Sequence, residues 1–189
     1  MSIKIYVDQG HNPRDFNTGA EGNGFYEQDI TYDIGVRLAR LLEANPNFEV
    51  RLSRPSEDSV RGTSNATSLS SRVREANAWG ADVFLSLHTN AATNPNATGS
   101  EALIYSRASR TAYELAEDIL AKMTEATGLR NRGIVERPGL YVLKETNMPA
   151  VLVEMGFISN VGDAELMAYS PELFARGIYN GILEYYDLD

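Results

Sequence analysis

The chain has 189 residues, of which 43% are hydrophobic, which predicts one compact domain over residues 1–189 with a sizeable core. The formal net charge of −9 argues against nucleic acid as a partner and against electrostatic adhesion to anionic membranes or polymers. The chain contains no cysteine, so disulfides are excluded and any metal must be bound by His, Asp or Glu. No apolar run approaches the roughly 20 residues of a membrane span, and the N-terminus does not have the pattern of a signal peptide.

Short apolar runs alternate with longer amphipathic stretches along the chain, a pattern typical of an α/β domain. We predict strands at residues 3–7, 48–52, 83–87, 102–105, 140–143 and 150–153. We predict helices at residues 27–44, 70–79, 110–127 and 171–185. The expected fold is therefore α/β, with a mostly parallel or mixed central sheet of about six strands flanked by helices on both faces.

The only two histidines in the chain, His11 and His88, each follow a strand-like apolar run. Glu27 lies in the first turn of the first predicted helix, and Glu154 ends the last predicted strand. In open α/β sheets ligands bind at the carboxyl ends of the strands, so these side chains can converge on one point. Two imidazoles and one carboxylate form a three-ligand zinc set with an open position, and a further carboxylate can handle the protons of a bound water.

Each of these residues also has a purely structural interpretation. A lone histidine is more often a core or surface residue than a metal ligand. Glu27 can simply complement the dipole of its helix, and Glu154 can be a solvated loop residue. The spacing alone therefore leaves a zinc hydrolase and structural roles both open.

Short motifs surround these four residues: D-Q-G-H at 8–11, G-x-x-E at 24–27, S-L-H-T-N at 86–90 and E-M-G-F-I-S-N at 154–160. Others are R-x-x-x-A-N at 72–77, R-G-I at 132–134, L-Y-V-L at 140–143 and M-P-A-V-L-V-E at 148–154. In this order, over nearly the whole chain, they resemble the zinc-dependent N-acetylmuramoyl-L-alanine amidases. This is the group of cell-wall amidases found in bacterial autolysins, spore-associated lytic enzymes and phage endolysins.

The resemblance implies that His11, Glu27 and His88 bind one zinc ion and that Glu154 is the catalytic carboxylate. The implied reaction is hydrolysis of the amide bond between N-acetylmuramic acid and L-alanine in peptidoglycan, which lyses or remodels the cell wall. In this reaction Glu154 takes a proton from the zinc-bound water and passes it to the leaving nitrogen. The fold that the resemblance implies, a mixed sheet flanked by helices, agrees with the predicted elements.

The first loop departs from the family pattern. The family usually has Pro where this chain has Gln9, and Gly-Gly where it has Asn12 and Pro13. These departures do not change any of the implied zinc ligands. They concern the shape of the first loop and its contacts with the substrate.

Three further residues receive weaker assignments. Asn90 is a candidate for contact with the stem peptide, or for local capping of a turn. Asp8 is a candidate partner for the second ring nitrogen of a ligating histidine, or a brace for the first loop. Arg72, on the second predicted helix, is expected to be a solvated or salt-bridged surface residue rather than a substrate contact.

Length and charge lead to expectations about regulation and partners. Some family members place an inhibitory helix after the second histidine ligand, and residues 89–100 are too few for a loop plus a stable helix, so we expect an open site. The expected partner is peptidoglycan, bound by a monomer; relatives often carry a separate wall-binding module, and none is visible here. The expected place of action is the bacterial cell wall, reached by secretion with the signal removed or by release from the cytoplasm on lysis.

Two other functions compete with this interpretation. Another zinc amidohydrolase, or a carboxypeptidase, would use the same ligand set and break a different bond. A non-catalytic peptidoglycan-binding module on a degenerate amidase fold would lack a ligand or Glu154, whereas this sequence has all four residues.

Overall fold

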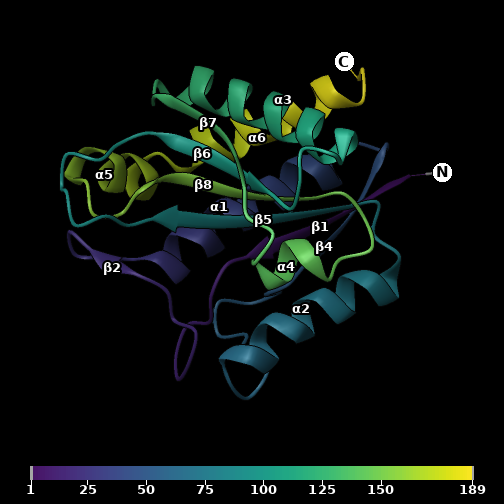
Figure 1. The fold of residues 1–189 in the computed structure, drawn as a ribbon, viewed down its shortest axis with the longest axis horizontal. Helices are drawn as coiled ribbons and strands as arrows, with labels where there is room; N and C mark the ends of the chain where they lie inside the picture. The colour runs from purple at the N-terminus through teal and green to yellow at the C-terminus, as the bar shows by residue number, and fades with distance from the viewer. Residues whose placement is uncertain (1, 189) are drawn as a thin grey trace.

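The computed structural model describes residues 2–188, and a six-stranded sheet runs through its centre (Figure 1). The strand order is β4 (Phe48–Leu52), β1 (Ile3–Gln9), β5 (Val83–Asn90), β8 (Ala150–Phe157), β6 (Ser100–Ile104) and β7 (Asn131–Glu136). The first four strands in this order are mutually parallel, β6 is antiparallel to β8, and β7 is parallel to β6. This mixed sheet in a single α/β domain confirms the predicted fold class.

Helices cover both faces of the sheet, as Figure 1 shows. One face packs against α1 (Glu27–Glu43), α3 (Arg110–Thr127) and α6 (Pro171–Tyr185). The other face packs against α2 (Asn65–Trp79) and the short α4 (Tyr141–Lys144). A further helix, α5 (Val161–Tyr169), follows β8. None of the helices in residues 2–188 combines the length and the apolar character needed to cross a bilayer.

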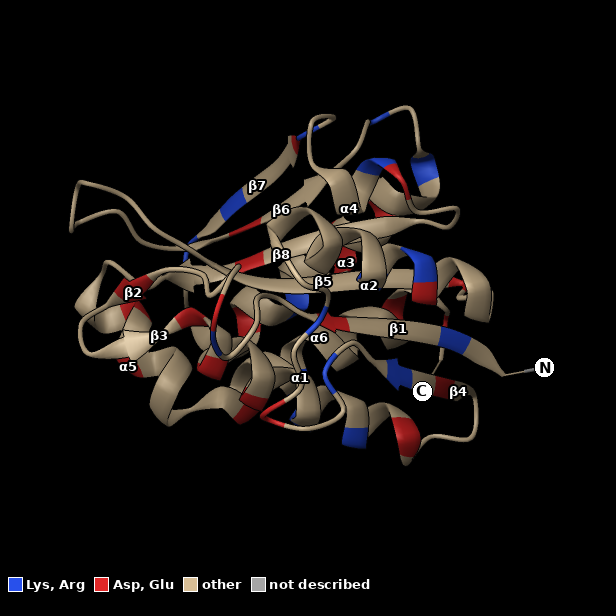
Figure 2. Ribbon diagram, turned by 90° about the horizontal axis from the view of Figure 1, so that it is seen from below, with Lys and Arg blue, Asp and Glu red and all other residues tan. Residues whose placement is uncertain are grey.

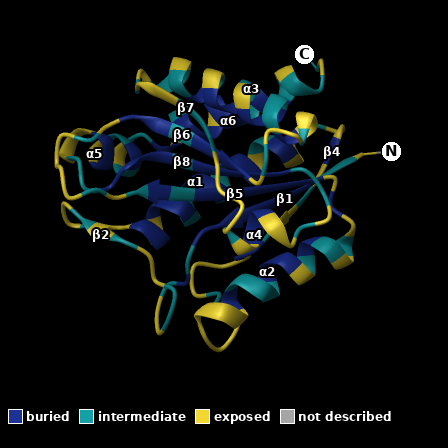
Figure 3. Ribbon diagram, viewed as in Figure 1, coloured by how far each residue is buried: buried dark blue, intermediate teal, exposed yellow. Residues whose placement is uncertain are grey.

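The central strands are buried on both faces, and Figure 3 shows this for β1, β5 and β8. Successive side chains enter different cores: Leu85 joins the larger core with α1, α3 and α6, whereas Phe84 joins the smaller core under α2 and α4. A strand buried on both faces has a nearly continuous apolar sequence, which is why the β5 run was predictable.

The predicted strand at residues 140–143 is wrong. Residues 141–143 belong to α4, and the sheet ends beside β6 with the edge strand β7, which was not predicted. Val142 and Leu143 are buried in the smaller core, and an apolar run of four residues does not distinguish a strand from a buried helical turn. β7 begins with Asn-Arg-Gly and lies at an edge, so its apolar pattern is weak.

Two other elements were missed, and one helix starts earlier than predicted. The missed elements are α5 and the two-stranded hairpin of β2 (Glu21–Gly22) and β3 (Phe25–Tyr26). α2 begins at Asn65 rather than at residue 70 because Ser64 and Thr67 form a capping box. The Thr67 backbone N–H donates to the Ser64 hydroxyl, and the Ser64 backbone N–H donates to the Thr67 hydroxyl.

Candidate metal centre

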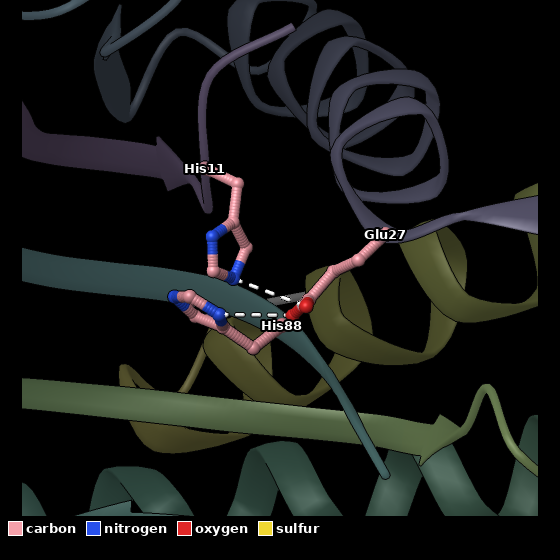
Figure 4. A group of neighbouring side chains, drawn as sticks. All are labelled: His11, Glu27 and His88. Carbon is pink, nitrogen blue, oxygen red and sulfur yellow. Dashed lines mark hydrogen bonds and ion pairs between the residues drawn. The ribbon is translucent and has the colours of Figure 1, made fainter. Parts of the chain in front are cut away.

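His11, Glu27 and His88 come together at the carboxyl edge of the sheet (Figure 4). His11 lies in the loop after β1, His88 lies in the last part of β5, and Glu27 is the first residue of α1. One donor atom from each side chain lies within 4.8 Å of the others. The three residues that the sequence indicated as ligands therefore converge on one point, although they are far apart along the chain.

The Glu27 carboxylate lies between the two imidazoles. Its Oε2 is 3.1 Å from Nε2 of His11, and its Oε1 is 3.1 Å from Nδ1 of His88. The backbone N–H groups of Ala20 and Thr89 donate to Oε2 and Oε1 at 2.8 and 2.9 Å. Burial raises the pKa of Glu27, but the hydrogen bonds and charges of the two histidines outweigh it and hold the pKa well below its usual range. The carboxylate is therefore ionised at neutral pH and fixed in orientation.

His11 has an unusual backbone conformation and a well-defined ring orientation. Its φ of +72° lies in the left-handed region, which residues other than glycine adopt infrequently. Nδ1 of its ring lies 3.1 Å from Oδ1 of Asn17 and 3.2 Å from the Asn17 carbonyl oxygen. A metal-ligating histidine usually has an acceptor at its second ring nitrogen, and Asn17 provides one here. Nε2 is thereby left to face Glu27.

Two glycines allow the ligand-bearing segments to approach each other closely. A Cβ atom on Gly10 would lie 2.6 Å from Cε1 of His88 and 2.6 Å from the Leu87 carbonyl oxygen. A Cβ atom on Gly19, whose φ is +82°, would lie 2.8 Å from Oε2 of Glu27 and 2.8 Å from the His11 ring. Any side chain at these positions would therefore displace the candidate ligands.

Glu154 lies beside His88 because the two residues are register partners in the parallel strands β8 and β5. Its Oε2 is buried and has no hydrogen-bond partner in the part of the chain that the structure describes. Burial raises the pKa of Glu154 to about 7; the charge of His88 opposes this shift, and the charges of Glu27 and Glu101 reinforce it. A buried carboxylate oxygen without a partner, next to the converging ligands, is typical of a functional group rather than a structural one.

The donor set fits a catalytic metal ion. Two imidazole nitrogens and one carboxylate face a common point, and this His₂Glu set is one that binds zinc in hydrolases while leaving a coordination position open. The burial of Glu27 and the hydrogen bonds to His11 and Glu27 hold the donors in place, so the site is largely formed by the protein fold itself.

The comparisons with known proteins decide the family. The family profile described as N-acetylmuramoyl-L-alanine amidase matches residues 5–184. This chain belongs to the N-acetylmuramoyl-L-alanine amidase family. The amidase thus acts on peptidoglycan as a metal-dependent hydrolase, with His11, Glu27 and His88 as its candidate metal site.

Individual relatives agree with this assignment. The chain is 36% identical to the N-acetylmuramoyl-L-alanine amidase CwlM of Bacillus licheniformis, over 98% of this chain and 70% of the relative. It is 37% identical to LytC of Bacillus subtilis, over 96% of this chain but only 35% of the relative. The crystal structure of an N-acetylmuramoyl-L-alanine amidase from Clostridium difficile 630 has a TM-score of 0.88, with 32% identity over 98% of this chain and 97% of that one.

Asp8 and Arg72 form a buried ion pair behind the metal centre of the amidase. Nη1 of Arg72 lies 2.5 Å from Oδ1 of Asp8, and Oδ2 of Asp8 accepts a hydrogen bond from Ser86 at 2.8 Å. Arg72 also donates to the carbonyl oxygens of Gln9 and His11 at 2.7 and 2.5 Å. Arg72 was expected to be a solvated or salt-bridged surface residue; it does form a salt bridge, but the surface position is wrong, because Arg72 is only 1% exposed. The side chain of Asp8 thus contacts Arg72 and Ser86, and the acceptor at Nδ1 of His11 is Asn17.

Asn90 is the last residue of β5, and its side chain is engaged within the protein. Its Nδ2 donates to Oε1 of Glu101 at 3.0 Å, and its Oδ1 accepts from the backbone N–H of Ala91 at 2.8 Å. Glu101, which the sequence did not single out, is in turn the register partner of Glu154 in β6. The contact between Asn90 and Glu101 could not be inferred from the sequence, because β6 follows β5 along the chain but pairs with β8.

Proposed function

We propose that this amidase is zinc-dependent and that Glu154 is its general base and acid. The observation that carries the proposal is the arrangement of the four side chains: His11 and His88 face Glu27, and the unpartnered oxygen of Glu154 lies next to His88. His11 Nε2, His88 Nδ1 and the Glu27 carboxylate would hold the ion. When bound, zinc supplies a Lewis acid that polarises the carbonyl oxygen and lowers the pKa of water to about 7.

The reaction that we propose is hydrolysis of the amide between the lactyl group of N-acetylmuramic acid and L-alanine. The amide nitrogen leaves poorly unless it is protonated, so a group is needed that first accepts a proton from water and then releases it. Glu154 suits both steps, because burial raises its pKa to about 7 and its Oε2 has no competing partner among residues 2–188. Both histidines face Glu27, which leaves Glu154 to carry the proton.

Replacing the Glu154 carboxylate tests this assignment. We expect Glu154→Gln to bind one zinc ion per chain, as the wild type does, and to hydrolyse a muropeptide about 100-fold more slowly or worse, because it cannot accept a proton. Zinc content is measured by mass spectrometry, and activity is measured as release of a free N-terminal alanine. The matched control is Glu49→Gln, which removes the same charge from an exposed position on β4. Undiminished hydrolysis by Glu154→Gln would show that another group moves the proton.

The bond that is broken separates this reaction from that of another zinc amidohydrolase or a carboxypeptidase. Cleavage at the lactyl amide produces a new free N-terminal L-alanine, whereas a carboxypeptidase releases the last residue of the stem. Loss of zinc from His11→Ala, with the fold retained by circular dichroism, would identify the histidine as a ligand. Full zinc occupancy in that variant would exclude this role.

The segment after β5 supports a site that is open without an activator. Residues 91–99 contain no helix in the structure, so the part of the chain described here has no inhibitory helix between β5 and β6. We infer that the isolated domain hydrolyses purified peptidoglycan by itself. CwlM and LytC are longer than this chain, and we infer that a separate wall-binding module, where one is present, supplies adhesion that a domain of net charge −9 lacks.

A further inference from the structure

A row of charged side chains leads away from the metal centre across the sheet. Strand register aligns His88 with Glu154, and Glu154 with Glu101, so the three residues lie side by side on the α2 face of β5, β8 and β6. β7 adds Arg132, whose Nε lies 3.5 Å from Oε2 of Glu101. In Figure 2 a blue segment of β7 accordingly lies beside red segments of β6 and β8. The row thus runs from a candidate metal ligand to a guanidinium group at the sheet edge.

The Arg132 side chain is held in place, but not all of its hydrogen-bond donors have a partner among residues 2–188. Its guanidinium stacks over the Phe157 ring at 4.9 Å, and its Nη1 donates to the Thr98 carbonyl oxygen at 3.2 Å. The β6–β7 register shifts at this point, next to Gly133 with a φ of +90°, and this irregularity directs the arginine toward Glu101. The side chain is still 34% exposed, and its Nη2 has no partner among residues 2–188. An oriented arginine with free donors is suited to bind a carboxylate.

The direction of the substrate follows from Glu154, and this step depends on the proposed function. The group that protonates the leaving nitrogen must lie within hydrogen-bond reach of it, so the L-alanine nitrogen lies on the β8 side of the ligands. The stem peptide therefore extends from β8 over β6 toward β7. Two extended residues span about 7 Å, and adjacent strands lie about 4.8 Å apart. The second stem residue then comes within reach of the long Arg132 side chain.

We propose that Arg132 binds a free carboxylate on the second residue of the stem peptide, so that the enzyme selects acidic stems over stems amidated at that position. A protein of net charge −9 would otherwise repel an acidic peptide, and a local cation is needed to reverse that effect. Glu101 positions the guanidinium, and Asn90 holds Glu101 in turn. The R-G-I motif at residues 132–134 thereby acquires a role in substrate recognition.

Two synthetic muropeptides test the proposal. They are identical except that the second stem residue carries either a free carboxylate or a carboxamide. We expect wild-type kcat/KM to be about tenfold higher for the carboxylate form, mainly through KM, as expected for one charge-assisted hydrogen-bonded pair. In Arg132→Gln we expect the two values to lie within about twofold of each other. Equal use of both substrates by the wild type, or a preference that survives in Arg132→Gln, would overturn the proposal.

Two variants control for indirect effects. Arg137→Gln removes the same charge about 16 Å away at the other end of β7, and it should retain the preference. The double variant Glu101→Gln with Arg132→Gln removes the glutamate that would otherwise be left unpaired. If the double variant regained the preference, repulsion by Glu101 rather than loss of the guanidinium would explain the single variant, and the proposal would be wrong.

A binding measurement separates this inference from the proposed reaction. Calorimetry with the free stem peptides reports affinity without hydrolysis, and the carboxylate form should bind about tenfold more tightly to the wild type than to Arg132→Gln. A protein that shows this difference but releases no N-terminal alanine would refute the proposed reaction and leave the role of Arg132 standing. A protein that releases N-terminal alanine from both substrates but shows no difference in binding would overturn the role of Arg132 and leave the proposed reaction standing.

Discussion

At the scale of single residues, the candidate site places its two carboxylates in different environments. His11 and His88 both face Glu27, and the backbone N–H groups of Ala20 and Thr89 keep that carboxylate oriented between them. Glu154 has no such partners at its Oε2 among residues 2–188, and its pKa is raised by burial. The same type of side chain is thus suited to the two roles that we propose, because hydrogen bonds stabilise the charged form of Glu27 and burial destabilises that of Glu154.

The close approach of β1 to His88 depends on the absence of a side chain at Gly10. We expect Gly10→Ala to destabilise the fold by about 1–3 kcal/mol and to weaken zinc binding, because the new Cβ would overlap both the His88 ring and the Leu87 carbonyl oxygen. Urea unfolding and a competitive zinc titration measure the two effects. Gly139→Ala is the matched control, since no other atom of the described chain lies within 4 Å of a Cβ built there. Equal stability and zinc affinity in the two variants would contradict this view of Gly10.

At the scale of elements, a buried arginine is one of the residues that join α2 to the sheet. Arg72 joins the helix to β1 through Asp8 and to the first loop through the His11 carbonyl oxygen. Ser86 of β5 holds the other oxygen of Asp8. The loop that carries His11 is therefore supported from beneath by groups on three different elements, and this pair acts on the centre through the backbone.

Removal of this arginine should destabilise the whole domain. We expect Arg72→Gln to lower the free energy of unfolding by about 3–5 kcal/mol, because Asp8 would remain buried without its countercharge. Chemical denaturation monitored by circular dichroism measures the loss. Arg74→Gln, two positions further along α2 and exposed, should change stability by less than about 1 kcal/mol. A small effect at Arg72, similar to that at Arg74, would show that the pair contributes little.

At the scale of the whole molecule, acid should destabilise the fold through Asp8. Burial raises the pKa of Asp8, but the charge and hydrogen bond of Arg72, aided by His88 and Ser86, outweigh it and place the pKa below its usual value. A carboxyl group whose pKa is lower in the folded protein than in the unfolded chain stabilises the fold. Its contribution is complete above the unfolded pKa of about 4 and is lost as the pH falls through the folded pKa.

Thermal unfolding of the metal-free protein measures this dependence. Protonation of Asp8 makes no contribution to a change in Tm between about pH 7 and pH 5, and it lowers Tm progressively below about pH 4. In Arg72→Gln the pKa of Asp8 is no longer held down, so the acid-dependent part of the decrease should be smaller. A Tm that rose on acidification below about pH 4 would contradict the sign of the effect.

Much of the candidate site could be predicted because its signals are local in the sequence. His11, His88 and Glu154 lie at or near the ends of apolar runs, and the parallel strands that these runs form bring their carboxyl ends to one edge. The convergence of His11, Glu27 and His88 agrees with that prediction. Asn17 and Glu101 could not be found in the same way, because a loop reversal and an antiparallel strand place them near the site.

The sequence by itself determined the α/β class, the main strands and helices, and the residues that could bind a metal. The reason is that hydrophobic periodicity and the ends of apolar runs are set by residues close together in the sequence. Only the tertiary structure decided that Arg72 is buried, that residues 141–144 form a helix, and that β7 forms an edge of the sheet with Arg132 beside Glu101. These features depend on partners that are distant in the sequence. A buried charge is stable only when its counterion is present, and an edge strand is defined by the strand it pairs with.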